Sequence, residues 1–246
     1  RDVAPSRGLG DVYKRQCPED APEHYGGGGS TVRHLAIIAD GNRRWAASQN
    51  LPKEAGHAQG LNVIEHCCEW AISRGVKMLT FYCFSTENWG RESGEVDHIM
   101  DLARWYFRER REWFVTCGIR VRFAGRRDRL AKDLVEDMET MEEETKQGDA
   151  LTLTICADYG GRDAITRAVQ HGARTEQELD VALTGEVPTP DAILRTGGEM
   201  RLSNFLLWQA AYAELFFSRT FFPALEDAEL DEVLNEHGER KRNYGT

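Results

Sequence analysis

The sequence lacks the patterns that mark several common classes of protein. It has no apolar run as long as a membrane span, and we expect no signal peptide. Six cysteines occur, at positions 17, 67, 68, 83, 117 and 156, and none forms a C-x-x-C pair. The usual zinc spacings are therefore absent. We expect buried, reduced thiols and a cytoplasmic protein, because disulfides are rare in a reducing compartment.

Two phosphate-binding motifs are also missing. No G-x-x-x-x-G-K-[ST] occurs, and no G-x-G-x-x-G follows a strand-like run, so we expect neither a P-loop nor a dinucleotide site. Asp and Glu outnumber Lys and Arg by 41 to 31, and the formal net charge of -10 argues against nucleic acid as a partner. An anionic ligand must instead be held by cations placed locally.

The composition is that of a globular protein. Hydrophobic residues make up 41% of the 246 residues, with ten phenylalanines and six tryptophans. Residues 1–30 differ from the rest, because they contain few large apolar side chains and end in GGGGS. We interpret 1–30 as a disordered tail, which could be non-native sequence, and 31–246 as one domain.

Strand-like and helical patterns alternate along this domain. Apolar strand-like runs cover 32–39, 76–84, 118–125, 151–157 and 191–196. Helical periodicity covers 58–74, 94–116 and 127–146, with Ser93 as a candidate N-cap of the second helix. This alternation predicts right-handed βαβ crossovers. We therefore expect a single α/β domain with a mostly parallel central sheet flanked by helices.

Candidate ligands follow the first strand-like run, because open α/β sheets bind ligands at the carboxyl ends of their strands. The segment reads Asp40, Gly41, Asn42, Arg43, Arg44 and Trp45. Gly41 permits a tight turn, and the two arginines favour an anion. Asp40 would repel a phosphate unless Mg²⁺ lay between them, since Mg²⁺ binds both kinds of oxygen. An equally supported alternative is that Asp40 caps a helix and the arginines face solvent.

Two later strand ends offer similar groups. The first supplies Ser85, Thr86, Glu87, Asn88, Trp89 and Arg91. The other places Arg195, Arg201 and Ser203 around a Gly-Gly pair, a set that could bind a diphosphate. Each segment alone could be an ordinary polar loop. The helix at 94–116 is rich in aromatic residues that could line an apolar channel or simply fill the core: Trp105, Tyr106, Phe107 and Trp113.

Five sequence blocks together resemble the cis-prenyltransferases. They are HLAIIADGNRRWA, GHAQG, LTFYCFSTENWGR, ADYGGR and ILRTGGEMRLSNFLLWQAAYAELFF, and they run from His34 towards the C-terminus. The resemblance implies attack of isopentenyl diphosphate on an allylic diphosphate primer (geranyl, farnesyl or geranylgeranyl), with loss of diphosphate and of a proton. It also implies an apolar tunnel, a homodimer, and a cytoplasmic enzyme with peripheral contact to the membrane that receives its product.

The resemblance also implies roles for individual residues. Asp40 would carry Mg²⁺, and residues 41–45 would bind the allylic diphosphate together with Lys53 and His57. The 85–91 block would close over substrate, with Asn88 as the family's proton acceptor. An amide is a weak base, so we interpret Asn88 as an orienting or relay group. Arg195, Arg201 and Ser203 would bind isopentenyl diphosphate, and Glu214 would be a second metal ligand or else an interface charge.

Some positions depart from the family pattern. Met200 stands where many relatives have histidine, and the C-terminal tail reads R-x-x-G where relatives often have R-x-G. An alternative function is a non-catalytic subunit of a heteromeric prenyltransferase, but such subunits lose the aspartate segment that this chain keeps. A phosphohydrolase would need a second carboxylate cluster, for which only Glu214 is available. Product length and the preferred primer stay open.

Overall fold

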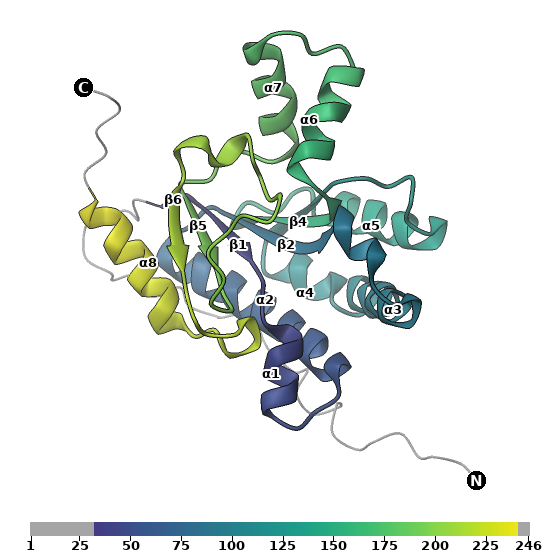
Figure 1. The fold of residues 1–246 in the computed structure, drawn as a ribbon, viewed down its shortest axis with the longest axis vertical. Coiled ribbons are helices and arrows are strands. Elements are labelled where there is room, and N and C mark those ends of the chain that lie inside the picture. Colours follow the sequence, from purple (N-terminus) through teal and green to yellow (C-terminus); the bar gives the residue numbers. More distant parts are fainter. Residues whose placement is uncertain (1–31, 241–246) are drawn as a thin grey trace.

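The computed structural model describes residues 32–240, whose centre is a parallel sheet with strand order β3-β4-β2-β1-β5-β6 (Figure 1). The strands are β1 (His34–Ile38), β2 (Met78–Ser85), β3 (Ile119–Ala124), β4 (Leu151–Tyr159), β5 (Ala192–Arg195) and β6 (Glu214–Phe217). Each of the five strand-like runs forms a strand, and every pairing is parallel. The predicted α/β fold is confirmed. The proposed tail at 1–30 lies outside the described residues.

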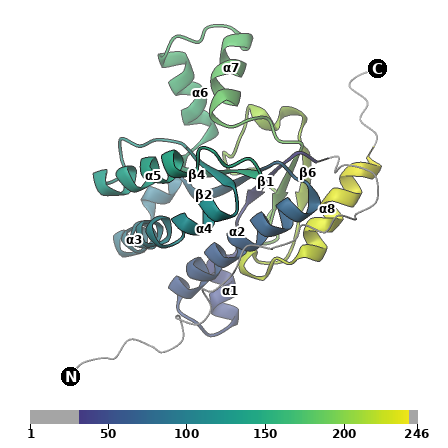
Figure 2. The same ribbon diagram turned by 180° about the vertical axis from the view of Figure 1, so that it is seen from behind.

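Helices cover both faces of the sheet. They are α1 (Asn42–Ser48), α2 (Lys53–Arg74), α3 (Ser93–Glu109), α4 (Arg111–Thr116), α5 (Lys132–Thr145), α6 (Gly161–Gln170), α7 (Glu176–Glu186) and α8 (Asp227–Glu239). Short 3₁₀ turns are η1 (Thr86–Gly90), η2 (Gln209–Tyr212) and η3 (Phe222–Ala224). Figure 2 shows α2 and α8 in front of the sheet, while α6 and α7 extend away from it as a pair.

The alternation of side chains along β1 explains why the strand is apolar from Leu35 to Ile38. Leu35 and Ile37 join the core under α2, α3, α5 and α8, whereas Ala36 and Ile38 join a second core under α6 and α7. All five β1 residues are buried. A strand covered on both faces favours apolar residues at successive positions, because successive side chains point to opposite faces. His34 is the polar exception in β1, and its Nε2 lies 2.8 Å from Thr80 Oγ1.

Two helix predictions need correction. The helix expected over 94–116 is two helices, because the chain breaks at Arg110 between α3 and α4. The Arg110 side chain is buried and its Nε donates to Glu65 Oε1 at 2.7 Å. Ser93 is the first helical residue rather than the N-cap; Glu92 holds that position in an extended conformation, with no side-chain capping bond.

Among the cysteines of residues 32–240, Cys117 is disulfide-bonded, contrary to the expected reduced thiols. The prediction of buried, reduced thiols holds for three of the four that are free. Cys67, Cys68 and Cys156 are buried. Cys83 is exposed, and the reason lies in the cavity described below. No helix within residues 32–240 combines the length and the apolar composition that a bilayer span requires.

Candidate active site

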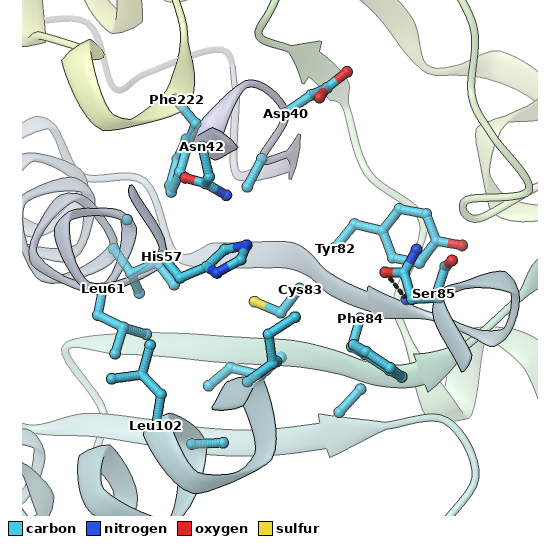
Figure 3. Close-up of a pocket in the computed structure, with 18 of the residues that line it drawn as sticks. Asp40, Asn42, His57, Leu61, Tyr82, Cys83, Phe84, Ser85, Leu102 and Phe222 are labelled. Carbon is cyan, nitrogen blue, oxygen red and sulfur yellow. Dashed lines mark hydrogen bonds between the residues drawn. The ribbon is translucent and has the colours of Figure 1, made fainter. Parts of the chain in front are cut away.

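The carboxyl ends of four strands open into one cavity of about 870 Å³ (Figure 3). Asp40 follows β1, Ser85 ends β2, Asp158 lies near the end of β4 and Arg195 ends β5, and all four line it. The parallel register brings these positions together, since Ile38 of β1 lies opposite Arg195 of β5. The edge of the sheet at which we predicted ligand binding therefore coincides with a cavity.

An ion pair between Asp40 and Arg195 joins two of the predicted phosphate-binding segments. Arg195 Nη2 donates to Asp40 Oδ2 at 2.9 Å, and Nη1 donates to Ser203 Oγ at 2.7 Å and to the Arg201 carbonyl at 2.6 Å. Arg44 Nη2 lies 3.2 Å from Asp40 Oδ1. Arg195 is only 4% exposed, so these bonds fix its guanidinium group at the cavity wall.

The turn after β1 depends on glycine. Gly41 has φ 108°, and a Cβ there would lie 2.7 Å from Cδ1 of Phe221. Gly41 is the N-cap of α1, and no side chain caps that helix. The alternative role of Asp40 as a capping residue is therefore wrong. Next to it, Asn42 Oδ1 is buried without a hydrogen-bond partner among the described residues, and Asn42 lines the cavity.

Three predicted cations gather around a carboxylate that the sequence analysis missed. Glu95 is 4% exposed, and its oxygens lie 3.0 Å from Arg91 Nη1, 3.4 Å from Lys53 Nζ and 3.7 Å from Arg43 Nη1. Burial raises the pKa of Glu95, but the charges of Arg91, Arg43 and Lys53 outweigh it, and the net pKa is lowered. The i,i+4 spacing of Arg91 and Glu95 was a local signal for this pair.

The η1 turn carries the 85–91 block, and only part of it reaches the cavity. Ser85, Asn88 and Arg91 line it, with Asn88 Oδ1 accepting from the Ser85 backbone N–H at 3.1 Å. Thr86, Glu87 and Trp89 do not line it. Glu87 Oε1 accepts a hydrogen bond from Asn204, and Trp89 Nε1 donates to Asp158 Oδ1 at 2.9 Å. These residues hold the block in place instead of contacting the cavity.

His57 and Cys83 face the same space (Figure 3). Burial, aided by the charge of Arg91, lowers the pKa of His57 to about 4, so the imidazole is neutral near pH 7. Cys83 lies at an irregularity in β2, where the register shifts between Tyr82 and Phe84. Such a bulge redirects one side chain. Although burial raises the pKa of the Cys83 thiol to about 12, its side chain is exposed to the cavity.

Three other predicted residues occupy different surroundings. Trp45 is half-buried but does not line the cavity. Arg201 lines it, is exposed, and pairs with the carboxylate of Glu199. Glu214 begins β6 opposite Ala192, at the amino end of the sheet, and its Oε2 accepts from Arg240 Nη1 at 2.7 Å. This chain therefore does not bring Glu214 beside Asp40 as a second metal ligand.

The deeper wall of the cavity is apolar. It is formed by Leu61, Ile64, Met100, Ala103, Tyr106, Phe107, Leu134 and Met138. These side chains come from α2, α3 and α5, beneath the cation-rich mouth. Tyr106 and Phe107 thus fulfil the channel-lining role considered for the aromatic residues. Trp113 is buried in the core, and Trp105 is 39% exposed. A site of this kind suits a ligand with an anionic head and a hydrocarbon tail.

The donor set for a metal is small. No group of three His, Cys, Asp or Glu side chains in residues 32–240 could enclose an ion. Asp40 is the carboxylate at the cavity mouth, and each of its two oxygens has one arginine partner. A carboxylate offers about four lone-pair positions, so acceptor capacity remains. This fits Mg²⁺, which commonly binds one or two carboxylates together with phosphate oxygens and water.

Comparison with known proteins identifies the family. Residues 38–245 match the prenyltransferase family model that describes undecaprenyl diphosphate synthases. The chain is 45% identical over 222 residues to the isoprenyl transferase of Aquifex pyrophilus, covering 86% of this chain and 95% of the relative.

Two solved structures share the fold. Lavandulyl diphosphate synthase from Lavandula x intermedia, in complex with dimethylallyl diphosphate, has a TM-score of 0.82 at 31% identity, covering 88% of this chain and 99% of that one. A "probable undecaprenyl diphosphate synthase" from Campylobacter jejuni has a TM-score of 0.76 at 34% identity, covering 87% and 99%. The chain belongs to the undecaprenyl diphosphate synthase family, the cis-prenyltransferases.

Proposed function

We propose that this cis-prenyltransferase condenses isopentenyl diphosphate with an allylic diphosphate in a Mg²⁺-dependent reaction that lengthens a cis-polyprenyl diphosphate. The observation that carries the proposal is the Asp40–Arg195 ion pair. It links two groups of cations at the mouth of an apolar cavity, so two diphosphates can lie side by side with their hydrocarbon parts directed inward.

The allylic diphosphate would bind on the Asp40 side of this pair. Arg43 and Arg44 start α1, and Lys53 starts α2, so their positive charges face one corner of the cavity. His57 is neutral there and can contribute hydrogen bonding rather than charge. Mg²⁺ held by Asp40 would offset the charge that develops on the departing diphosphate.

Isopentenyl diphosphate would bind on the Arg195 side. The buried guanidinium group is already oriented by Ser203 and by the Arg201 carbonyl, so little ordering is needed when a phosphate arrives. Asn88 Oδ1 already accepts from the Ser85 N–H, which leaves its NH₂ group to meet substrate. An NH₂ donor orients an oxygen but does not take a proton, so we assign Asn88 an orienting role.

The growing hydrocarbon chain would occupy the apolar depth of the cavity between α2, α3 and α5. Burial of each added unit is favourable because apolar surface leaves water. The same wall keeps water away from the allylic carbon, which limits hydrolysis.

The proposed assembly is a homodimer that meets a membrane through its product. In support of the dimer, β6 ends the sheet, and Leu215 and Phe217 on this strand are 37% and 38% exposed. A second copy could cover such an edge. Sedimentation of the purified protein tests the dimer, and a difference in product release with and without lipid vesicles tests the membrane contact.

Incubation with labelled isopentenyl diphosphate and Mg²⁺ tests the reaction. Geranyl, farnesyl and geranylgeranyl diphosphates serve as primers, and dimethylallyl diphosphate is added because the lavender relative binds it. Labelled products longer than the primer are expected, and their loss on chelation of Mg²⁺ would support the metal requirement. Absence of label with every primer would favour a binding subunit of a heteromeric enzyme.

A further inference from the structure

The loop after β5 contains an asparagine, Asn204, that contacts two other segments, the start of α6 and the η1 turn. Ser203, Asn204 and Leu206 all have positive φ, at 49°, 67° and 42°. This left-handed region is costly for most residues, and asparagine tolerates it better than others. Such conformations persist only where surrounding contacts hold them, and they concentrate at functional sites.

Asn204 uses its backbone carbonyl and both polar atoms of its side chain in hydrogen bonds. Its carbonyl accepts from the Gly161 N–H at 2.6 Å, and its Oδ1 accepts from the Arg162 N–H at 2.9 Å. Its Nδ2 donates to Glu87 Oε1 at 2.8 Å. The loop is thereby tied to the start of α6 on one side and to the η1 turn on the other.

The ADYGGR motif acquires a role from these contacts. A Cβ at Gly160 would lie 2.7 Å from Asn204 Nδ2 and 2.6 Å from Thr86 Oγ1. A side chain at this position would therefore push Asn204 and the η1 turn apart. Gly160 lets the two segments approach each other across the end of β4.

The neighbours of these contacts belong to the proposed site. Ser203, directly before Asn204, accepts from Arg195 Nη1, and Asn88, directly after Glu87, lines the cavity. The hydrogen bond from Asn204 to Glu87 thus links the proposed isopentenyl diphosphate site to the η1 turn. On its other side, η1 is held by the bond from Trp89 to Asp158, a buried residue that also has a positive φ of 51°.

We propose that Asn204 is a positioning residue that fixes the η1 turn relative to the Arg195–Ser203 pair through its bond to Glu87. The inference rests on the proposed condensation, because positioning has meaning only if Asn88 and Arg195 serve the same reaction. Burial raises the pKa of Glu87, but the bonds from Asn204 and neighbouring groups outweigh it, and the net pKa is lowered. Glu87 is therefore an ionised acceptor near pH 7.

An exchange of donor and acceptor tests this role. Asn204→Asp tolerates the left-handed conformation and still accepts from Arg162, but it loses the NH₂ donor and faces Glu87 with a like charge. In the native background we expect kcat/KM for isopentenyl diphosphate to fall about threefold to tenfold, with most of the loss in kcat. In a Glu87→Gln background the new amide can donate to the introduced carboxylate, so the same substitution should cost at most about twofold.

A matched control removes the same kind of donor elsewhere. Asn62 Nδ2 donates to Gln59 Oε1 at 3.1 Å on α2, outside the cavity lining. Asn62→Asp should leave kcat/KM unchanged.

Thermal unfolding of every variant is measured alongside the kinetics. An equal loss in both Glu87 backgrounds, or a loss that parallels a fall in Tm, would overturn the inference while the condensation stands. If the unaltered protein incorporates no label, both proposals fail together.

Discussion

The two ends of the sheet both hold buried polar side chains, yet they differ in how these are satisfied. At the amino end, His34 Nε2 lies 2.8 Å from Thr80 Oγ1, and Asp191 Oδ2 accepts from the N–H groups of Arg33 and His34 at 2.8 and 2.9 Å. At the carboxyl end, Asp40 and the cations around it border an open cavity.

The difference lies in charge and access rather than in the number of polar groups. The amino-end network is closed, so each group has fixed protein partners and there is little to gain from a ligand. The carboxyl end concentrates arginines and a lysine around two carboxylates, and it leaves Asn42 Oδ1 without a partner among residues 32–240. An anionic ligand would pair with these cations, whereas Asn42 Oδ1 is an acceptor and needs a hydrogen-bond donor.

The largest expected contrast between the two ends of the sheet comes from replacing one aspartate at each end with alanine. Asp40→Ala should lower kcat/KM about 10²-fold to 10³-fold, because it removes the carboxylate proposed to hold Mg²⁺ against the reacting diphosphate, and should change Tm little. Asp191→Ala should do the opposite, lowering the free energy of unfolding by about 1–3 kcal/mol because two backbone N–H groups lose their acceptor. Assays and urea unfolding of both variants decide, and near-native turnover in Asp40→Ala would remove this residue from the reaction.

A substitution at Arg195 distinguishes the binding sites of the two substrates. Arg195→Ala should raise KM for isopentenyl diphosphate about tenfold to a hundredfold, with a smaller effect on the allylic substrate. The control is Arg122→Ala, since Arg122 Nη2 also donates to a carbonyl, that of Gly185, at 3.0 Å but away from the cavity. A rise confined to the allylic KM would reverse the assignment of the two sites.

Glu95 tests whether the cations at the mouth depend on a shared anchor. Glu95→Gln should raise KM for the allylic diphosphate about threefold to tenfold, because Arg43, Lys53 and Arg91 lose the carboxylate that gathers them. Glu92→Gln is the matched change, since Glu92 is 90% exposed and lies 3.7 Å from Lys53. A lower KM in Glu95→Gln would show instead that Glu95 weakens anion binding.

Burial of His34 at the amino end of the sheet predicts a dependence of protein stability on pH. Burial lowers the pKa of His34 from 6.5 to about 4, so between these values the unfolded chain binds more protons than the folded one. Stability should therefore rise with pH across this window, and His34 should contribute about 1–2 kcal/mol of the difference between pH 5 and pH 7. Urea unfolding at both pH values measures it. His34→Asn should reduce the slope.

Much of the fold could be read from the sequence because its signals are local. The apolar run before Asp40 predicted a strand, and the glycine after it predicted the turn. β6 was missed, and its pairing with β5 rather than its length or composition makes its four residues a strand. The break at Arg110 was missed for a related reason, since its partner Glu65 lies on another helix.

The candidate site divides in the same way. Asp40, Arg195 and Ser203 were predicted because each follows or ends a strand, and the topology of a parallel sheet brings such positions to one edge. Asn204 went unrecognised because its role depends on segments far away in the sequence. Glu214 was assigned as a metal ligand from its motif, but the register of β6 places it at the other end of the sheet.

Local patterns in the chain were enough to establish five of the six strands, the polar groups that follow them, and the family that the motifs resemble. These properties depend on periodicity and on neighbours along the chain. Folding in three dimensions was needed to establish that Asp40 pairs with Arg195, that Glu95 gathers three cations, and that Asn204 reaches the η1 turn. The physical reason is that hydrogen bonds and ion pairs act over a few ångströms in space, whatever the number of residues between the partners.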